Sequence, residues 1–444
     1  MQRARASPTT ASDAADPGPC KPVMSEPRIA VIGLGYVGLP LAVALARQFD
    51  VTGFDIDSER IAELASGRDR TREVAEDELR QTRLKLSHRQ DDCAGADVYI
   101  VTVPTPVDAA NRPDLTAVLA ATRMVAGLID AGRRPTIVYE STVYPGVTED
   151  ICGPEIERVS GFQRGRDFRL GYSPERINPG DREHTVDKIT KVIAGEDEEV
   201  VEQLAMIYGA ITSGGVFRAA SIKAAEAAKA IENAQRDINI AFMNEAAQIF
   251  SKIGVSMWDV LAAAKTKWNF LGFEPGLVGG HCIGVDPYYL SHLAQQLGHD
   301  PQVILSGRQT NDLMGTWIAD ALHDRRGKAG SALVLGLTFK ENVPDLRNSR
   351  SFDLVRRLSW LGHDVDVADP LASADEIERE HKLKVADPAG RSYDLVIGAV
   401  AHSEYRDLAD DRLAGLVAPG GTLADLRGMW RDRRLDPAID RWSL

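Results

Sequence analysis

The stretch that decides the fold reads Arg28-Ile29-Ala30-Val31-Ile32-Gly33-Leu34-Gly35-Tyr36-Val37-Gly38. An apolar run that can form a strand leads directly into a Gly-x-Gly-x-x-Gly turn, and residues 39–48 follow at helical spacing. A second apolar run, residues 50–54, ends in Asp55. The glycine motif alone is a weak signal, but strand, turn, helix, strand and acid in this order predict a dinucleotide-binding unit.

The residue types in this unit indicate the cofactor. Glycines let the backbone approach a pyrophosphate, which rests on the N-terminus of the following helix. Asp55 can accept a hydrogen bond from the adenosine ribose 2′-hydroxyl, and its charge repels a 2′-phosphate. The sequence therefore predicts NAD rather than NADP; the alternative is a glycine-rich turn that binds nothing.

Polar, turn-forming groups follow two later strand candidates. Residues 98–103 end at Pro104-Thr105-Pro106, and residues 136–140 end at Ser141-Thr142. Ligands of open α/β sheets bind beyond the carboxyl ends of the strands, so we expect both groups to line the cofactor cleft. The alternative for Pro104-Thr105-Pro106 is a rigid turn without a binding role.

A long alanine-rich helix is predicted from Ser221, its N-cap, to about Gly254. Lys229 and Asn233 are four residues apart and share one face of this helix. The small residues beside them allow another body to approach closely, so the helix is interpreted as a connector and a dimer spine. The alternative for Lys229 and Asn233 is an ordinary solvated face.

A cysteine follows a glycine pair in Gly279-Gly280-His281-Cys282, and Asp286 lies four residues on. Paired glycines predict a tight loop that presents the thiol to a ligand. The alternative for Cys282 is a buried structural cysteine, the usual fate of a single intracellular thiol.

Composition limits the function classes. The 444 residues are 44% hydrophobic and 26% charged, as in globular proteins of two to three domains. A net charge of −13 argues against nucleic acid and anionic membranes as partners. The four cysteines are scattered without a Cys-x-x-Cys pair, which argues against a zinc site and for a reducing, cytoplasmic setting. Residues 1–27 contain no apolar core of a secretory signal and are interpreted as a disordered leader, or as an upstream start with Met24 the real one.

A second α/β unit follows a linker at residues 327–330. It has no Gly-x-Gly-x-x-Gly motif, so its ligand is not expected to be a dinucleotide. Lys340 and Arg347 lie on a polar loop after its first strand and can bind a phosphate group. We therefore predict an α/β fold with two Rossmann-like domains joined by a long central helix. The predicted divisions are a leader (1–27), an NAD-binding domain (28–212), a central helical domain (213–326) and a second Rossmann-like domain (327–444).

Several long motifs resemble one family, the UDP-glucose/GDP-mannose dehydrogenases, over about residues 28–426. The matching segments are the glycine turn 33–40, Glu140-Ser141-Thr142-Val143, residues 228–233, Gly279-Gly280-His281-Cys282 and Phe339-Lys340. Histidine rather than serine before the cysteine, together with residues 172–180 and 267–271, is similar to bacterial UDP-N-acetylglucosamine and UDP-N-acetylgalactosamine 6-dehydrogenases. Gln309 and Lys265 depart from the pattern of that subgroup.

The resemblance implies a four-electron oxidation of a sugar C6 alcohol to a carboxylate with two NAD⁺, for surface polysaccharide synthesis. It also implies a homodimer and a UDP-sugar-binding role for the domain at residues 327–444. The implied catalytic residues are Cys282 as nucleophile, Lys229 and Asn233 as oxyanion donors, Asp286 and Thr142 as holders of a basic water, and Glu175 in thioester hydrolysis. The implied cofactor-binding residues are Gly33, Gly35, Tyr36, Val37, Gly38, Asp55, Arg60, Pro104, Thr105, Ser141, Thr142 and Arg347. The implied substrate-binding residues are Glu175, Arg176, Lys229, Asn233, Lys267, Asn269, Phe270, Gly279, Phe339 and Lys340.

Two other functions stay open at this stage. A two-electron hydroxyacid-type dehydrogenase shares the Rossmann start and the long helix but needs no cysteine. A non-catalytic nucleotide-sugar-binding protein would keep the glycines and lose the nucleophile. Within the favoured class, UDP-N-acetylmannosamine and UDP-glucose remain alternative substrates.

Overall fold

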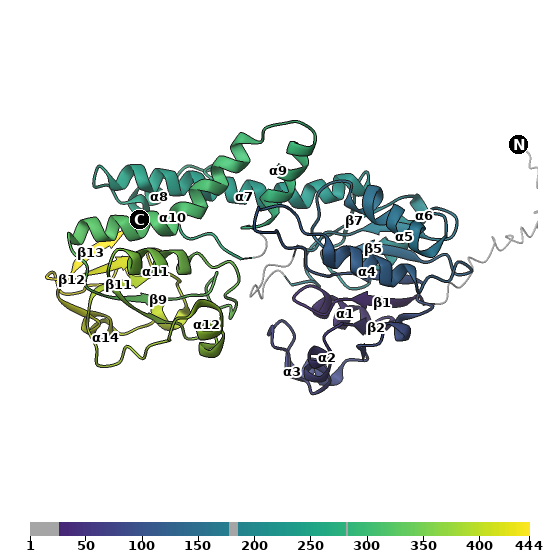
Figure 1. Cartoon of the computed structure of the whole chain (residues 1–444), viewed down its shortest axis with the longest axis horizontal. Coiled ribbons are helices and arrows are strands. Elements are labelled where there is room, and N and C mark those ends of the chain that lie inside the picture. The colour runs from purple at the N-terminus through teal and green to yellow at the C-terminus, as the bar shows by residue number, and fades with distance from the viewer. Residues whose placement is uncertain (1–25, 177–184, 281–282) are drawn as a thin grey trace, which may run out of the picture.

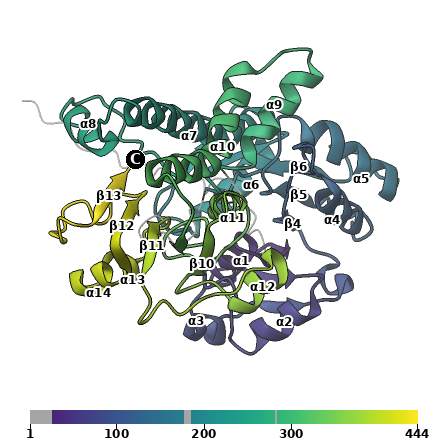
Figure 2. The same ribbon diagram turned by 60° about the vertical axis from the view of Figure 1, so that its left-hand side comes forward.

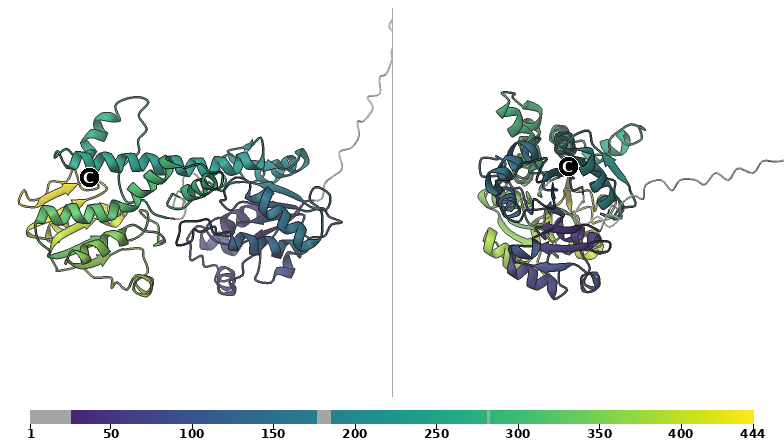
Figure 3. Two further views of the ribbon diagram at one scale, coloured as in Figure 1. Left: turned by 45° about the horizontal axis from the view of Figure 1, so that its top comes forward. Right: turned by 90° about the vertical axis from the view of Figure 1, so that its right-hand side faces the viewer.

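The computed structural model describes residues 26–176, 185–280 and 283–444. Two α/β lobes are bridged by the 30-residue helix α7 (Ile222–Ser251), which extends over both of them (Figures 1 and 3). The predicted fold, two Rossmann-like domains joined by a long central helix, is confirmed. Within these described ranges, no helix has the length and apolarity needed to span a membrane.

The N-terminal lobe is built on an eight-stranded sheet with strand order β3-β2-β1-β4-β5-β6-β7-β8. All neighbouring pairs are parallel except β6 and β7. The strands are β1 (Arg28–Ile32), β2 (Asp50–Phe54), β3 (Lys85–Ser87), β4 (Val98–Val101), β5 (Thr136–Tyr139), β6 (Arg169–Tyr172), β7 (Lys191–Gly195) and β8 (Val216–Arg218). The helices are α1 (Gly38–Ala46), α2 (Ser58–Ala65), α3 (Glu76–Gln81), α4 (Thr116–Ala126), α5 (Gly153–Ser160) and α6 (Glu198–Gly209).

Strand β1 is the point at which the strand order of this sheet reverses. The chain places β2 on one side of β1 and then places β4 on the other. Loops that leave such a switch point diverge and open a crevice at the carboxyl ends of the strands. The glycine turn follows β1 and therefore opens into this crevice.

The C-terminal lobe contains an all-parallel five-stranded sheet with strand order β10-β9-β11-β12-β13. Its strands are β9 (Ser331–Leu335), β10 (Asp364–Ala368), β11 (Tyr393–Gly398), β12 (Val417–Asp425) and β13 (Asp440–Ser443). Its helices are α11 (Ser351–Trp360), α12 (Ala374–His381), α13 (Ser403–Arg406) and α14 (Asp410–Gly415). Uninterrupted apolar runs such as Leu395–Ile397 suit strands whose two faces are both covered.

Helix α7 is anchored in both hydrophobic cores. Ile222 and Ala225, in its first turn, pack in the core of the N-terminal lobe. Met243 and Ala247, five to six turns later, pack with α10 (Gln302–Arg326) in the core of the C-terminal lobe. Helices α8 (Met257–Ala264) and α9 (Asp286–Gln296) lie on the same side of the molecule as α7 and α10 (Figure 2). The middle turns of α7 therefore hold their side chains at a fixed place between the two lobes.

Candidate functional site

The glycine turn after β1 has the geometry that a bound dinucleotide needs. Gly33 has a positive φ of 98° and donates its backbone N–H to the Phe54 carbonyl, at 2.8 Å. A Cβ at Gly38 would overlap the Gly33 carbonyl and the Thr102 hydroxyl, whereas a Cβ at Gly35 would meet no atom within 4 Å. Gly38 is thus required for packing, and Gly35 leaves open space at the N-terminus of α1 for a pyrophosphate.

Asp55 stands at the end of β2, as predicted, and holds the turn. Its carboxylate accepts the backbone N–H groups of Leu34 at 2.8 Å and Asp57 at 2.9 Å. Arg60 lies beneath the turn, 3% exposed, and donates to the Leu34 carbonyl at 3.1 Å and to Asp69 at 2.8 Å. The third guanidinium nitrogen of Arg60, Nη1, is buried and has no partner among the described residues. Asp55 is half-buried and keeps lone pairs for a ribose hydroxyl.

The loops after β4 and β5 reach the same crevice. The Ser141 hydroxyl donates to the Val103 carbonyl at 2.6 Å and thereby joins the two loops. Tyr289 of α9 donates its hydroxyl to the Thr105 carbonyl. The Pro104-Thr105 turn is consequently tied to the helix that follows the cysteine loop, and Thr142 lies half-buried beside Ser141 in sequence.

Lys229, Asn233 and Asp286 form a buried cluster between the lobes. Lys229 is 7% exposed and Asn233 is 8% exposed, so they do not lie on a solvated helix face. The Asn233 amide donates to the Asp286 carboxylate at the start of α9. Burial raises the pKa of Asp286 to about 6, although the positive charge of Lys229 acts in the opposite direction. A carboxylate with this pKa can take up a proton near neutral pH.

The predicted nucleophile Cys282 lies outside the described residues, but the glycine pair before it is placed. A Cβ on Gly279 would stand 2.6 Å from the Asn348 carbonyl oxygen, and a Cβ on Gly280 would stand 2.6 Å from the Phe339 ring. Gly280 also has a positive φ of 86°. The glycine pair therefore allows the loop after β9 to pack directly on the cysteine loop, and Phe339 makes that contact.

A buried polar network holds the start of the cysteine loop. Asn244 of α7 accepts the Gly276 N–H at 2.8 Å and donates to the Gly276 carbonyl at 3.0 Å. Asn244 also donates to Asn311 of α10 at 2.8 Å, and Asn311 donates to the Asp237 side chain at 2.7 Å. Arg308, 1% exposed, donates to Asp237, so this arginine supports the fold and is not free to bind phosphate. Sequence reasoning did not assign this network.

A second buried network surrounds the predicted residue Glu175. Lys191, fully buried on β7, donates to Glu140 at 3.0 Å and to Glu175 at 3.2 Å. Tyr208 donates to the other oxygen of Glu140. Burial raises the pKa of Glu140 to about 7. Sequence reasoning missed Lys191 and Tyr208; a lysine that begins an otherwise apolar strand, Lys191–Ala194, was the available signal.

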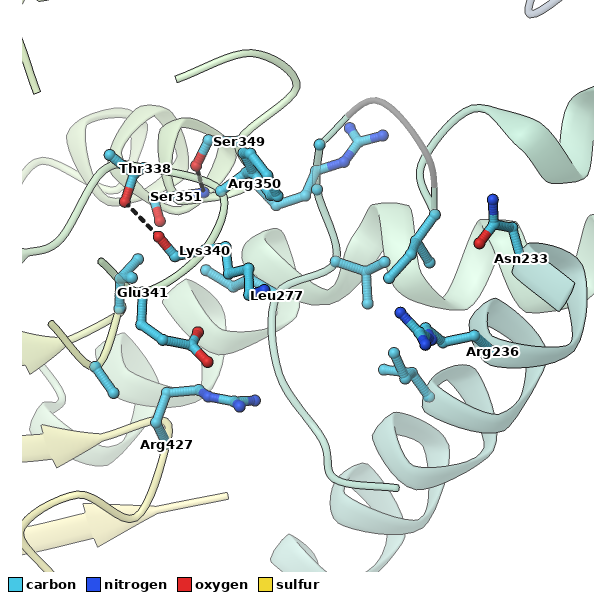
Figure 4. Close-up of a pocket in the computed structure, with 18 of the residues that line it drawn as sticks. Asn233, Arg236, Leu277, Thr338, Lys340, Glu341, Ser349, Arg350, Ser351 and Arg427 are labelled. Atoms are coloured by element: carbon cyan, nitrogen blue, oxygen red, sulfur yellow. Dashed lines mark hydrogen bonds between the residues drawn. The ribbon is translucent and has the colours of Figure 1, made fainter. Parts of the chain in front are cut away.

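Lys229, Asn233 and the glycine pair border a cavity of about 780 Å³ between the lobes (Figure 4). Among the described residues that line it, Arg176, Lys229, Arg236, Lys340, Arg350 and Arg427 are cationic, and Glu232 and Glu341 are acidic. Six cations against two carboxylates, in a chain of net charge −13, make this a local site for an anionic ligand. Gly279, Phe339 and Asn233, which were predicted to bind substrate, also line this cavity.

Other predicted residues lie elsewhere. Lys267, Asn269 and Phe270 follow α8 and are not among the described residues that line the cavity; Lys267 and Asn269 are exposed. Arg347 was expected to bind a phosphate and to belong to the cofactor site; its guanidinium lies 4.8 Å from the Tyr36 ring centre and donates to Asp345 at 2.7 Å. It therefore covers the glycine turn from the opposite lobe, on the cofactor side.

Comparison with known proteins gives one consistent result. Three family models match the chain: the NAD-binding domain of the UDP-glucose/GDP-mannose dehydrogenase family at residues 27–212, its central domain at 223–313 and its UDP-binding domain at 333–432. Protein CapL of Staphylococcus aureus is 47% identical over 423 residues, 94% of this chain and 99% of that protein. A UDP-N-acetyl-D-glucosamine 6-dehydrogenase of Pseudomonas aeruginosa is 47% identical over 421 residues, 93% of this chain and 99% of that protein. A solved UDP-D-ManNAc dehydrogenase from Pyrococcus horikoshii superposes with a TM-score of 0.81 at 29% identity, covering 94% of this chain and 98% of that one.

Proposed function

Because the chain belongs to the UDP-glucose/GDP-mannose dehydrogenase family and is an NAD-dependent dehydrogenase, we propose that it oxidises the C6 alcohol of a UDP-N-acetylhexosamine to the carboxylate. The proposed substrate is UDP-GlcNAc or UDP-GalNAc, and the product would serve surface polysaccharide synthesis. The observation that carries the proposal is the buried Lys229–Asn233–Asp286 cluster beside a cationic cavity between the two lobes. The name of the Pseudomonas aeruginosa relative supports the choice of sugar.

The residues around the glycine turn fit NAD. The open space at Gly35 suits the pyrophosphate, and Asp55 suits the adenosine ribose. Arg347, stacked on Tyr36, closes the turn from the C-terminal lobe. When bound, NAD⁺ accepts the hydride in each of the two oxidations.

We assign the remaining chemistry to residues of this chain. A water held by Asp286 and Thr142 removes the proton of the C6 hydroxyl as the alcohol becomes an aldehyde. The Cys282 thiolate adds to the aldehyde carbon, and Lys229 and Asn233 stabilise the oxyanion of the resulting thiohemiacetal. The second oxidation converts the thiohemiacetal to a thioester. Water, activated with the help of Glu175, cleaves the C–S bond to release the carboxylate and regenerate the thiol.

The number of NADH molecules formed per sugar tests this function. We expect two NADH per UDP-N-acetylhexosamine, release of a uronic acid and no accumulated aldehyde. Cys282→Ser should lower the overall rate by at least roughly 10²–10⁴-fold, because a serine hydroxyl is far less acidic than a thiol. A wild-type yield of one NADH, or near-normal turnover by Cys282→Ser, would indicate a two-electron dehydrogenase instead. A panel of UDP-sugars, including UDP-glucose and UDP-N-acetylmannosamine, decides the substrate.

We also propose a homodimer built on α7. Ile231, Phe242 and Ile249 of α7 are large apolar residues, each more than half exposed. At about 100° per residue they form one stripe, on the face of α7 opposite Lys229, Asn233 and Arg236. An exposed apolar stripe of this kind favours burial against a partner, and a second copy would cover it without closing the cavity. A monomer mass by light scattering at micromolar concentration would contradict this proposal.

A further inference from the structure

One cation of the cavity, Arg236, has no role in the chemistry assigned above. Arg236 lies on α7 seven residues after Lys229, and Lys229, Asn233, Arg236 and Ile240 all line the cavity. Their spacings of 4, 7 and 11 residues place these four side chains on one face of the helix. Figure 4 shows the Arg236 guanidinium pointing from α7 into the cavity.

The neighbouring charges leave Arg236 available. In the described part of the chain, its guanidinium makes no hydrogen bond or ion pair. The carboxylate one turn earlier, Glu232, is bound to Arg176 at 2.8 Å. Arg350 is bound to Asp353 at 3.1 Å as well as to Asp312. The cavity therefore contains a cationic group on a rigid helix, and no described residue neutralises its charge.

The direction of α7 indicates which part of a ligand Arg236 meets. Lys229 lies beside Asp286, at the reacting end, and α7 then runs toward the lobe that matches the UDP-binding domain. Seven residues advance along the helix by about 10 Å. In a UDP-sugar the hexose ring and its anomeric oxygen separate the oxidised carbon from the nearer phosphate, and the uridine lies beyond both phosphates. A residue farther along α7 than Lys229 thus faces the sugar-linked phosphate.

We propose that Arg236 is a substrate-binding residue that holds the sugar-linked phosphate of the nucleoside diphosphate sugar. This inference rests on the proposed function and assigns the phosphate contact to a residue that the sequence motifs did not indicate. The planar guanidinium can donate two parallel hydrogen bonds to phosphate oxygens. Because α7 is fixed in both cores, this contact sets the distance between the phosphate and the Lys229–Asp286 end of the cavity.

The test compares UDP with UMP, which lacks the sugar-linked phosphate. Dissociation constants are measured by titration calorimetry on the full chain for wild type, Arg236→Met, Arg236→Lys and the control Gln235→Met. Gln235 is the exposed neighbour of Arg236 and is not among the described residues that line the cavity. We expect Arg236→Met to weaken the binding of UDP roughly 10- to 100-fold, the range for loss of a charged hydrogen bond. It should change the dissociation constant of UMP less than about threefold. Arg236→Lys should fall between, and Gln235→Met should match wild type.

Three results would overturn the assignment. Arg236→Met could leave the affinity for UDP unchanged, or it could weaken the binding of UDP and UMP equally. It could also leave the UDP affinity intact while raising KM for UDP-N-acetylhexosamine but not for UDP-glucose, in which case Arg236 contacts the acetamido group. Failure of the proposed function would give a different result. A wild-type protein that bound neither UDP nor UMP would contradict the UDP-sugar site itself. Unchanged melting temperatures and NAD⁺ affinity in the variants exclude a general structural effect.

Discussion

Replacing Asp286 by asparagine should make the protein more stable and less active, and both effects should depend on pH. Asp286 is 3% exposed, and burial raises its pKa from 3.8 to about 6. Below pH 3.8 the carboxyl group is protonated in the folded and the unfolded chain. Between pH 3.8 and 6 the unfolded chain has lost this proton while the folded chain retains it, so stability falls as pH rises. Above pH 6 both states are ionised and the loss is complete.

The size of this loss follows from the shift. About two pKa units correspond to about 3 kcal/mol. Asparagine resembles the protonated carboxyl group and keeps an oxygen that can accept the Asn233 amide. Asp286→Asn should therefore raise the free energy of unfolding by up to about 3 kcal/mol at pH 8 and by less than about 1 kcal/mol at pH 4. Activity should fall by roughly 10²–10⁴-fold, because an amide cannot accept the proton.

Thermal unfolding measured at several pH values provides the assay. A chain with two cores need not unfold in two states, so the comparison is between melting temperatures of variant and wild type at each pH. The control is Asp324→Asn, the same chemical change at an exposed position of α10, and its effect should not vary with pH. The wild-type pH profile of kcat/KM should also show an acidic limb near pH 6. If Asp286→Asn has the same melting temperature as wild type at pH 8, the buried carboxylate does not destabilise the fold and the reasoning is refuted.

Three further changes test the turn and the buried lysine. Asp55→Ala should narrow the preference for NAD over NADP, measured as the ratio of kcat/KM values, because it removes a charge that repels a 2′-phosphate; an unchanged ratio would contradict this. Gly38→Ala should lower both melting temperature and NAD⁺ affinity because its Cβ overlaps the Gly33 carbonyl, whereas Gly35→Ala should weaken NAD⁺ alone because its Cβ enters only the ligand space. Lys191→Met should destabilise the fold by about 3–5 kcal/mol, since it removes the buried cation to which Glu140 and Glu175 are both bound, and Lys191→Arg should be milder; equal melting temperatures for both would argue against the ion network.

The glycine turn could be predicted from the sequence because its interactions are local. Gly33, Gly38 and Asp55 lie within one βαβ unit, and the contacts that fix them close within about twenty residues. The residue types also leave few alternatives, since a Cβ at Gly38 would overlap the backbone. The fold, the cofactor and the family could be inferred from this unit and from the motifs that accompany it.

The buried networks could not be predicted in the same way, because their members are distant in sequence. Lys191 meets a carboxylate 51 residues earlier, and Asn244 meets Gly276 and Asn311 at separations of 32 and 67 residues. No periodicity or spacing marks such pairs. Arg236 lies outside the motif that contains Lys229 and Asn233, and its proposed phosphate contact depends on the cavity between the lobes, which no local sequence pattern indicates.

Both lobes use the same turn to end their first strand. Gly336 repeats the positive φ of Gly33, 99° against 98°, and each glycine donates its N–H to the last residue of the neighbouring strand. Asp369 accepts the backbone N–H of Leu337 at 2.6 Å, as Asp55 accepts that of Leu34 at 2.8 Å. Each lobe therefore directs a ligand to the carboxyl edge of its own sheet.

The segment after this turn differs between the lobes, and this difference explains why the two lobes suit different ligands. In the N-terminal lobe α1 begins at Gly38, so its N-terminus is available to a pyrophosphate. In the C-terminal lobe α11 begins only at Ser351, and the intervening loop places Phe339 on Gly280. The second turn is thus followed by a loop that lines the cavity between the lobes, and not by a helix N-terminus. Since α7 is fixed in both cores, the proposed function requires the cofactor and the nucleotide sugar to meet along its middle turns, where Lys229 and Asn233 are buried.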